Sequence, residues 1–276
     1  MHVRHRHLPT GWYPDTERQT RAKIEFFRKN LGAPSGKTGA VAGILPHAGW
    51  DYSGALAFDV VRRIGLEHGT VVVVGGHLSP SAAIYAAFED AFETPLGSLV
   101  TDKQLLQEIA RRIDLVEDRL VDNTVEVQLP LVKFVFPEAS VLSFRVPPAQ
   151  SAIRLAAAIR DAAGKLDKTV VVLGSTDLTH YGPAYGFEPR GTGEKAVKWV
   201  KDVNDRRFLE AILSMRMKDA MDIAVEEQSA CSAGAAVAAA AFAAGGGVKE
   251  GRLINYLTSW DVHPSSSFVG YAGIVF

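Results

Sequence analysis

The chain has 276 residues, 47% of them apolar and 22% charged, and its formal net charge is −1. This composition is typical of a globular protein with a sizeable core. It gives no electrostatic reason to expect nucleic acid or an anionic membrane as a partner, so we expect neither. No apolar run approaches the ~20 residues that span a bilayer, and residues 1–7 lack the apolar segment of a secretory signal. A single cysteine excludes an intramolecular disulfide, and we expect a cytoplasmic protein.

Strand and helix patterns alternate along the first half of the chain. Residues 70–74 form a β-branched run, which is typical of a strand covered on both faces. Pro130 should kink or divide a helical pattern over 125–136. The other expected elements, in order, are a helix capped by Asp15 and ended by Gly32, a strand over 40–45, a helix over 55–64, a further strand over 82–88 and a helix over 102–113.

The second half continues the alternation. An Ala-rich helix follows Cys231 and ends at 245–247; because it is slim, we expect it to pack centrally. Residues 182–193 are expected to form a flexible loop. The other expected elements are strands over 140–146, 169–173, 253–259 and 268–276 and helices over 153–163, 203–215 and 220–225. We therefore predict one α/β domain over 1–276, with a mostly parallel central sheet flanked by helices.

Three histidines share one sequence context. His47, His77 and His180 each lie just beyond an expected buried strand, in Gly- or Ser-rich turns. The carboxyl ends of parallel strands meet at one edge of a sheet, so these side chains can converge. Neutral imidazole is a ligand for iron, zinc, copper and nickel. The pattern favours a shared metal site, with His47 in the turn 46–54 as its first ligand.

Cys231 and Asp177 are the strongest additional candidates. Cys231 is expected at the first turn of the Ala-rich helix, where the helix dipole favours the ligating thiolate. Asp177 stands three residues before His180 and is expected to orient its imidazole. Two other interpretations stay open for Cys231: a small buried hydrophobic residue, or a nucleophile with a histidine base.

Other polar residues carry weaker signals. The histidines at 2, 5 and 7 are interpreted as a solvated tail, and His263 fits either a surface or a site residue. Asn123, Glu126 and Gln128 belong to an expected helix start, where they serve as capping residues or face the site. The sequence holds neither a Walker-type phosphate loop nor a paired Cys-x-x-Cys zinc motif.

Several short motifs occur in a fixed order along nearly the whole chain. They are Gly-Trp-Tyr at 11–13, Pro-His-Ala-Gly at 46–49 with Tyr-Ser-Gly at 52–54, Val-Glu-Val-Gln-Leu-Pro at 125–130, Ser-Thr-Asp-Leu-Thr-His-Tyr-Gly at 175–182, Thr258-Ser259 with Asp261, and Val-Gly-Tyr-Ala at 269–272. Together they resemble the MEMO family, which includes the B component of the bacterial and archaeal AmmeMemoRadiSam system.

The resemblance implies a fold similar to the class III extradiol ring-cleavage dioxygenases, which are non-haem Fe(II) enzymes. It implies that His47, His77 and Cys231 bind the metal, with iron or copper as the ion, and that His180 takes the place of an acid/base histidine. A functional link to radical-SAM and AMMECR-type proteins is also implied. Residues expected to line the pocket or support it are Trp12, Trp50, Tyr52, Asn123, Glu126, Gln128, Asp261 and His263.

The chain departs from the family pattern at three places. Asn123 and Thr124 stand where a histidine is common, Trp50 stands where tyrosine is usual, and Gly75-Gly76-His77 is one residue shorter than the usual Gly-Pro-x-His. In the family, Cys231 replaces a carboxylate ligand of the dioxygenases. These changes predict a pocket that accepts a different substrate.

Our primary hypothesis is a dioxygenase-like oxidoreductase that uses Fe(II), with copper or zinc as alternatives, on a small substrate, aromatic compounds included. His180 would be its general acid/base and Asp177 the residue that orients it. The alternative is a module that binds iron, copper or a peptide without turnover. Catalysis by a Cys231 nucleophile is the third hypothesis.

Overall fold

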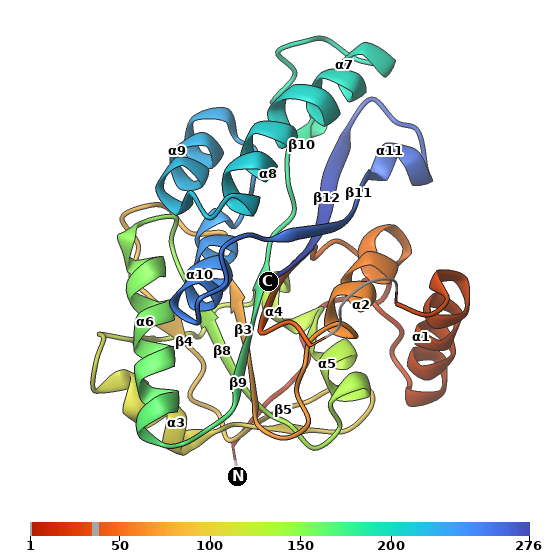
Figure 1. Cartoon of the computed structure of the whole chain (residues 1–276). Coiled ribbons are helices and arrows are strands. Elements are labelled where there is room, and N and C mark those ends of the chain that lie inside the picture. The colour runs from red at the N-terminus through yellow and green to blue at the C-terminus, as the bar shows by residue number, and fades with distance from the viewer. Residues whose placement is uncertain (1, 35–38) are drawn as a thin grey trace.

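A mixed sheet runs through the centre of the chain in the computed structural model, which describes residues 2–34 and 39–276 (Figure 1). Within these residues nine strands pair in the order β10-β12-β2-β9-β3-β8-β4-β7, with β11 beside β12. The strands are β2 (Ala42–Leu45), β3 (Thr70–Gly75), β4 (Tyr85–Ala86), β7 (Val116–Glu117), β8 (Ser140–Arg145), β9 (Val170–Ser175), β10 (His180–Tyr181), β11 (Arg252–Thr258) and β12 (Phe268–Val275).

The four strands β2, β9, β3 and β8 are parallel, and antiparallel pairs flank them on both sides. The predicted α/β fold with a largely parallel centre is confirmed. Along β3 the side chains alternate between the two faces of the sheet: Val72 and Val74 enter one hydrophobic core, and Val71 and Val73 enter the other. Both faces are therefore buried, which is why the strand is continuously apolar.

Helices cover both faces of the sheet (Figure 1). One layer contains α3, α6, α9 and α10, and the other contains α1, α2 and α5. The helices are α1 (Glu17–Leu31), α2 (Ala55–Val61), α3 (Lys103–Ala110), α4 (Asn123–Glu126), α5 (Leu129–Val135), α6 (Gln150–Lys165), α7 (Glu194–Trp199), α8 (Asp205–Leu213), α9 (Met217–Glu227), α10 (Ala233–Gly245) and α11 (Ser259–Val262).

The Ala-rich helix α10 is central, as predicted. Its alanines are almost all buried, and it packs between α6, α9 and strand β9. The approach to β9 is so close that a Cβ at Gly174 would collide with the Ala235 carbonyl oxygen. Small side chains thus let this helix bring its own N-terminus to the carboxyl edge of the sheet.

Several boundaries differ from the sequence predictions. Thr16, not Asp15, caps α1, because the Thr16 side chain accepts from Gln19 N–H. The pattern over 125–136 is divided into α4 and α5, with Pro130 in the first turn of α5, where its missing N–H is harmless. The strand expected over 82–88 is reduced to β4. Helix α7 lies N-terminal to the stretch expected to be helical, and the region 182–193 contains a 3₁₀ turn at Pro183–Tyr185.

The N-terminal segment is not a solvated tail. Its backbone forms β1 (Val3–Arg4), which joins β5 (Ala91–Phe92) and β6 (Leu99–Val100) in a small sheet. The side chains of His2, His5 and His7 are exposed, as expected.

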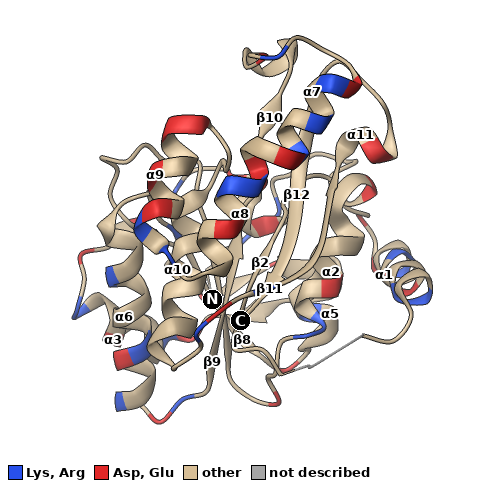
Figure 2. Ribbon diagram, turned by 45° about the horizontal axis from the view of Figure 1, so that its top comes forward, with Lys and Arg blue, Asp and Glu red and all other residues tan. Residues whose placement is uncertain are grey.

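Charged residues lie on the outer helices, where both signs are interspersed in the view of Figure 2. The parallel strands β2, β3 and β9 carry none, whereas β8 ends in the buried residue Arg145. Within the part of the chain that the structure describes, no helix is both long and apolar enough to cross a membrane.

Candidate metal centre

Strand ends bring the predicted site residues to one edge of the sheet. His47 follows β2 and His77 follows β3, while Asp177 and His180 follow β9. Cys231 arrives from the opposite direction, two residues before α10, and its backbone N–H donates to the Asp177 carbonyl (3.1 Å). The predicted position of Cys231 in the first helical turn is therefore wrong, because Ser232 is the N-cap of α10.

His47, His77 and Cys231 form a compact cluster. One nitrogen of each imidazole and the Cys231 sulfur all lie within 4.8 Å of one another. The Sγ atom of Cys231 is 3.2 Å from Nε2 of His47, and the two imidazole rings meet edge to face at 4.9 Å. In residues 2–34 and 39–276 this is the one group of three or more such side chains with a spacing that could hold a metal ion.

A network of buried polar groups fixes His47, which is only 2% exposed. Its backbone N–H donates to Asp177 Oδ1 (2.7 Å), and its Nδ1 lies 3.2 Å from Ser175 Oγ. Gln128 donates to the same Ser175 hydroxyl and to the Pro46 carbonyl. With Nδ1 engaged, Nε2 is the nitrogen that faces Cys231.

His77 is held differently because it lies at the solvent edge. Its φ of 58° is unusual for a residue with a side chain, and its backbone N–H donates to Ser232 Oγ (3.2 Å). Its Nδ1 lies 3.1 Å from Asp122 Oδ2. A Cβ at Gly76 would lie 2.5 Å from the Ser232 side chain, so this approach requires glycine.

Opposite charges meet in the cluster. Burial alone would raise the pKa of the Cys231 thiol, but His47 and His77 lower that pKa well below its ordinary value. Burial likewise opposes a charge on His77, yet Asp122 and Cys231 raise the His77 pKa to about 10. These shifts favour a thiolate beside a protonated His77 in the metal-free cluster, and a divalent cation would displace that proton.

The cluster opens into a cavity of about 470 Å³. His180, Asn123 and His263 line it. Its walls also include the aromatic residues Trp12, Tyr52, Tyr185 and Tyr271 and the hydroxyl residues Ser259, Ser265 and Ser267. Neither lysine nor arginine is among the described lining residues.

The chain matches the family model described as "Memo-like protein" over residues 4–275. It is 31% identical to a MEMO1 family protein of Thermococcus onnurineus over 99% of both chains. It is 30% identical to one of Pyrococcus abyssi over 99% of both chains, and 31% identical to one of Methanopyrus kandleri over 96% and 95%. The chain belongs to the Memo family.

Four of the residues that we expected to line the pocket or support it lie outside the cavity wall. Trp50 is buried and donates to the Val127 carbonyl (3.1 Å). Gln128 lies behind Ser175, as described above. Glu126 accepts from the backbone of the N-terminal segment and from Tyr13 Oη. Asp261 completes a capping box with Thr258 and pairs with Lys201. These four residues support the walls and do not line the cavity.

Asp177 also has a different set of partners from the predicted one. Its carboxylate accepts from His47, its carbonyl accepts from Cys231, and none of its described hydrogen bonds reaches His180. The His180 ring instead meets the Tyr185 ring edge to face at 5.0 Å. Asp177 thus joins two members of the metal cluster, and Tyr185 is the described ring partner of the His180 imidazole.

Sequence reasoning missed three polar residues at this Memo family site: Asp122, Ser175 and Ser232. Ser175 ends β9 two residues before Asp177, and Ser232 adjoins Cys231, so proximity to the candidate ligands was an available signal. Asp122 is 45 residues from His77, and only the three-dimensional structure connects them.

Proposed function

We propose that this Memo family chain is a non-haem metal oxidoreductase, with Fe(II) as the ion and a small aromatic or phenolic compound as the substrate. The convergence of His47, His77 and Cys231, with both histidines lining an open cavity, supports the proposal. Two imidazoles and a thiolate suit iron, copper or zinc. With these three ligand atoms on one side, a bound metal ion would keep open coordination positions toward the cavity. Cooperation with radical-SAM and AMMECR-type proteins is part of the same proposal.

Different residues bind the metal, transfer the proton and contact the substrate. His47 and His77 bind through Nε2, since their Nδ1 atoms contact Ser175 and Asp122. When bound, iron supplies redox chemistry and a binding position for O₂. His180 faces the same cavity, where its imidazole accepts a proton from a substrate hydroxyl and returns it later. The rings of Tyr52, Tyr185 and Trp12 pack against the substrate and exclude water.

Anaerobic reconstitution tests the ligand assignment. Wild-type protein should bind about one Fe(II) per chain, and His47→Ala and Cys231→Ser should bind much less. His263→Ala is a matched control, because His263 lines the cavity but lies outside the cluster. Unchanged iron content in His47→Ala and Cys231→Ser would refute the assignment.

Oxygen uptake tests the reaction. The iron-loaded protein should consume O₂ in the presence of a phenol or an indole. His180→Ala should keep its iron yet slow the uptake by about 10²-fold or more if the imidazole transfers the proton.

The thiolate in the cluster favours a second candidate, metal binding without turnover. A sulfur donor suits Cu(I) and Zn(II) as well as iron. Tight binding of these ions by a protein that consumes no O₂ with any tested phenol or indole would support that candidate over the oxidoreductase.

A further inference from the structure

The least protected side of the metal cluster is His77, whose side chain is 36% exposed. Its backbone has positive φ, and two glycines precede it. Packing therefore does little to fix the imidazole, and polar contacts must do so. From outside the cluster, the polar contact that reaches the ring is Nδ1 to Asp122 Oδ2, at 3.1 Å.

Asp122 belongs to a line of alternating charges whose middle members, Asp118 and Arg145, are buried. Arg145 grips Asp118 with two hydrogen bonds of 2.9 and 2.8 Å, and the side chains of both residues are 4% exposed. The same guanidinium lies 3.8 Å from Asp122 and 3.5 Å from the carbonyl of Gly76, the residue before His77. Arg145 thus lies near two groups that position His77: the backbone carbonyl of Gly76 and the carboxylate of Asp122.

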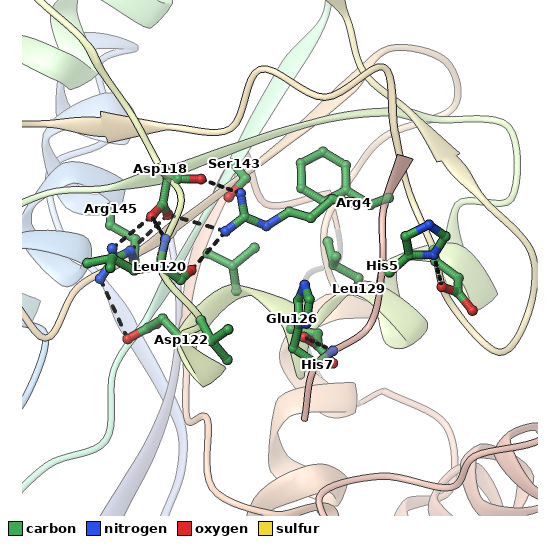
Figure 3. Close-up of a pocket in the computed structure, with 14 residues that line it drawn as sticks. Arg4, His5, His7, Asp118, Leu120, Asp122, Glu126, Leu129, Ser143 and Arg145 are labelled. Atoms are coloured by element: carbon green, nitrogen blue, oxygen red, sulfur yellow. Dashed lines mark hydrogen bonds and ion pairs between the residues drawn. The ribbon is translucent and has the colours of Figure 1, made fainter. Parts of the chain in front are cut away.

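The line continues to the N-terminal strand. The Arg4 guanidinium donates to the carbonyls of Asp118 (2.7 Å) and Leu120 (3.0 Å). These bonds hold the segment that leads into Asp122. Figure 3 shows Arg4, Asp118, Arg145 and Asp122 along one side of a small pocket, joined by these contacts.

We propose that Asp122 is the positioning residue for the metal ligand His77, and that Arg4, Asp118 and Arg145 hold Asp122 in place. The proposal rests on the metal site proposed above. A carboxylate behind a ligating histidine fixes the ring and its tautomer, and its loss typically weakens metal binding 10–100-fold. The N-terminal strand is thereby coupled to the metal centre.

A simpler role for Asp122 is to cap α4, since Oδ1 accepts from Thr124 N–H. Asp122→Asn separates the two roles. Asparagine is as good a cap, but its NH₂ group would face the Nδ1–H of His77, so two donors would meet. Asp122→Ser also keeps a capping oxygen and is too short to reach the imidazole.

The test uses Co(II) as the probe, titrated by its visible absorption, in which the Cys231 thiolate gives a charge-transfer band. Asp122→Asn and Asp122→Ser should keep that band while their Kd for Co(II) rises 10–100-fold. Arg4→Gln should raise Kd by a smaller factor. Arg119→Gln should leave it unchanged, because Arg119 lies on the same segment but its side chain is 80% exposed.

Arg145→Met alone would remove both hydrogen bonds from the buried Asp118 carboxylate and leave it only the Arg4 guanidinium at 3.8 Å, a loss large enough to prevent folding. The paired variant Asp118→Asn with Arg145→Met removes both charges together, and its Kd should also rise.

The outcomes separate the two proposals. Wild-type Co(II) affinity in Asp122→Asn and Asp122→Ser, with lost affinity in Cys231→Ser, would overturn the role of Asp122 and leave the metal site standing. Unchanged affinity in Cys231→Ser would overturn the site itself, and this proposal with it. Urea unfolding of the metal-free variants should match the wild type. If a lower free energy of unfolding accounts for the weaker binding, Asp122 acts by stabilising the folded chain, and its positioning role is overturned.

Discussion

Among single residues, the cluster of His47, His77 and Cys231 contains ionised side chains even without a metal. The thiolate faces imidazoles whose pKa values are raised, that of His77 to about 10. At neutral pH His77, whose pKa is raised to about 10, carries a proton that a bound cation must displace. Metal binding at pH 7 should therefore release protons, the one on His77 included. Calorimetry of Zn(II) binding in buffers of different ionisation enthalpy measures the number released. A release near zero would mean that the imidazoles are already neutral.

Asp205 is a buried carboxyl group away from the metal cluster. It accepts from Thr179 and from Tyr256 Oη (2.7 Å), and burial raises its pKa to about 6 although these hydrogen bonds oppose the shift. Between about pH 4 and pH 6 the folded chain keeps a proton that the unfolded chain has lost. Stability from this group is therefore present at low pH and falls as the pH rises through that range.

Asp205→Asn should remove that dependence. The variant should gain up to about 3 kcal/mol over the wild type at pH 7.5, following the shift from 3.8 to about 6, and little at pH 4. Urea unfolding at the two pH values checks the expectation. The exposed neighbour Asp202 offers a control, since Asp202→Asn should change stability by less than about 0.5 kcal/mol at either pH. An equal effect of Asp205→Asn at both values would contradict the prediction.

The sequence was sufficient to expect that His47, His77 and His180 approach one another, because each follows a buried parallel strand. It could not supply Asp122, whose short chain reaches His77 only because β8 and the N-terminal strand position its segment. The sequence also could not show that Asp177 accepts a hydrogen bond from His47 and not from His180, because this contact depends on how the segments fold together. Spacing along the chain favoured the nearer histidine, whereas the turn after β2 brings the His47 backbone to the carboxylate.

At the scale of elements, the contact between α10 and β9 depends on missing side chains. Gly174→Ala should push the helix away from the sheet, because the new Cβ would meet the Ala235 carbonyl. We expect a loss of roughly 1–3 kcal/mol in the free energy of unfolding. Gly164→Ala in α6 is the matched control, since a Cβ there meets nothing within 4 Å and should stabilise the helix by up to about 1 kcal/mol. Equal effects of the two changes in urea unfolding would exclude the packing argument.

Long apolar runs identified the central strands, and Pro130 correctly predicted the division between α4 and α5. The small sheet of β1, β5 and β6 was beyond reach, because two-residue strands leave no alternating pattern. Helix α7 was missed for a related reason: its six residues are too few to show a helical repeat.

At the scale of the whole molecule, the metal and the fold should stabilise each other. The ligands come from three segments that only folding brings together, so an ion bound to the folded chain shifts the unfolding equilibrium. At a free Zn(II) concentration of 100 times Kd the gain should be about 2.7 kcal/mol. Thermal melts with and without Zn(II) measure it, with a chelator to reverse the effect. A Cys231→Ser protein stabilised as much as the wild type would show that the ion binds elsewhere.

The two sides of the cluster differ in how firmly they are anchored. Cys231 adjoins the largely buried helix α10, and His47 is buried in its own network, whereas His77 stands at the solvent edge after two glycines. An ion would therefore enter and leave past His77. The exchange rate of the metal, and hence how long one chain keeps its ion, would be governed by the segment around Asp122 more than by the core.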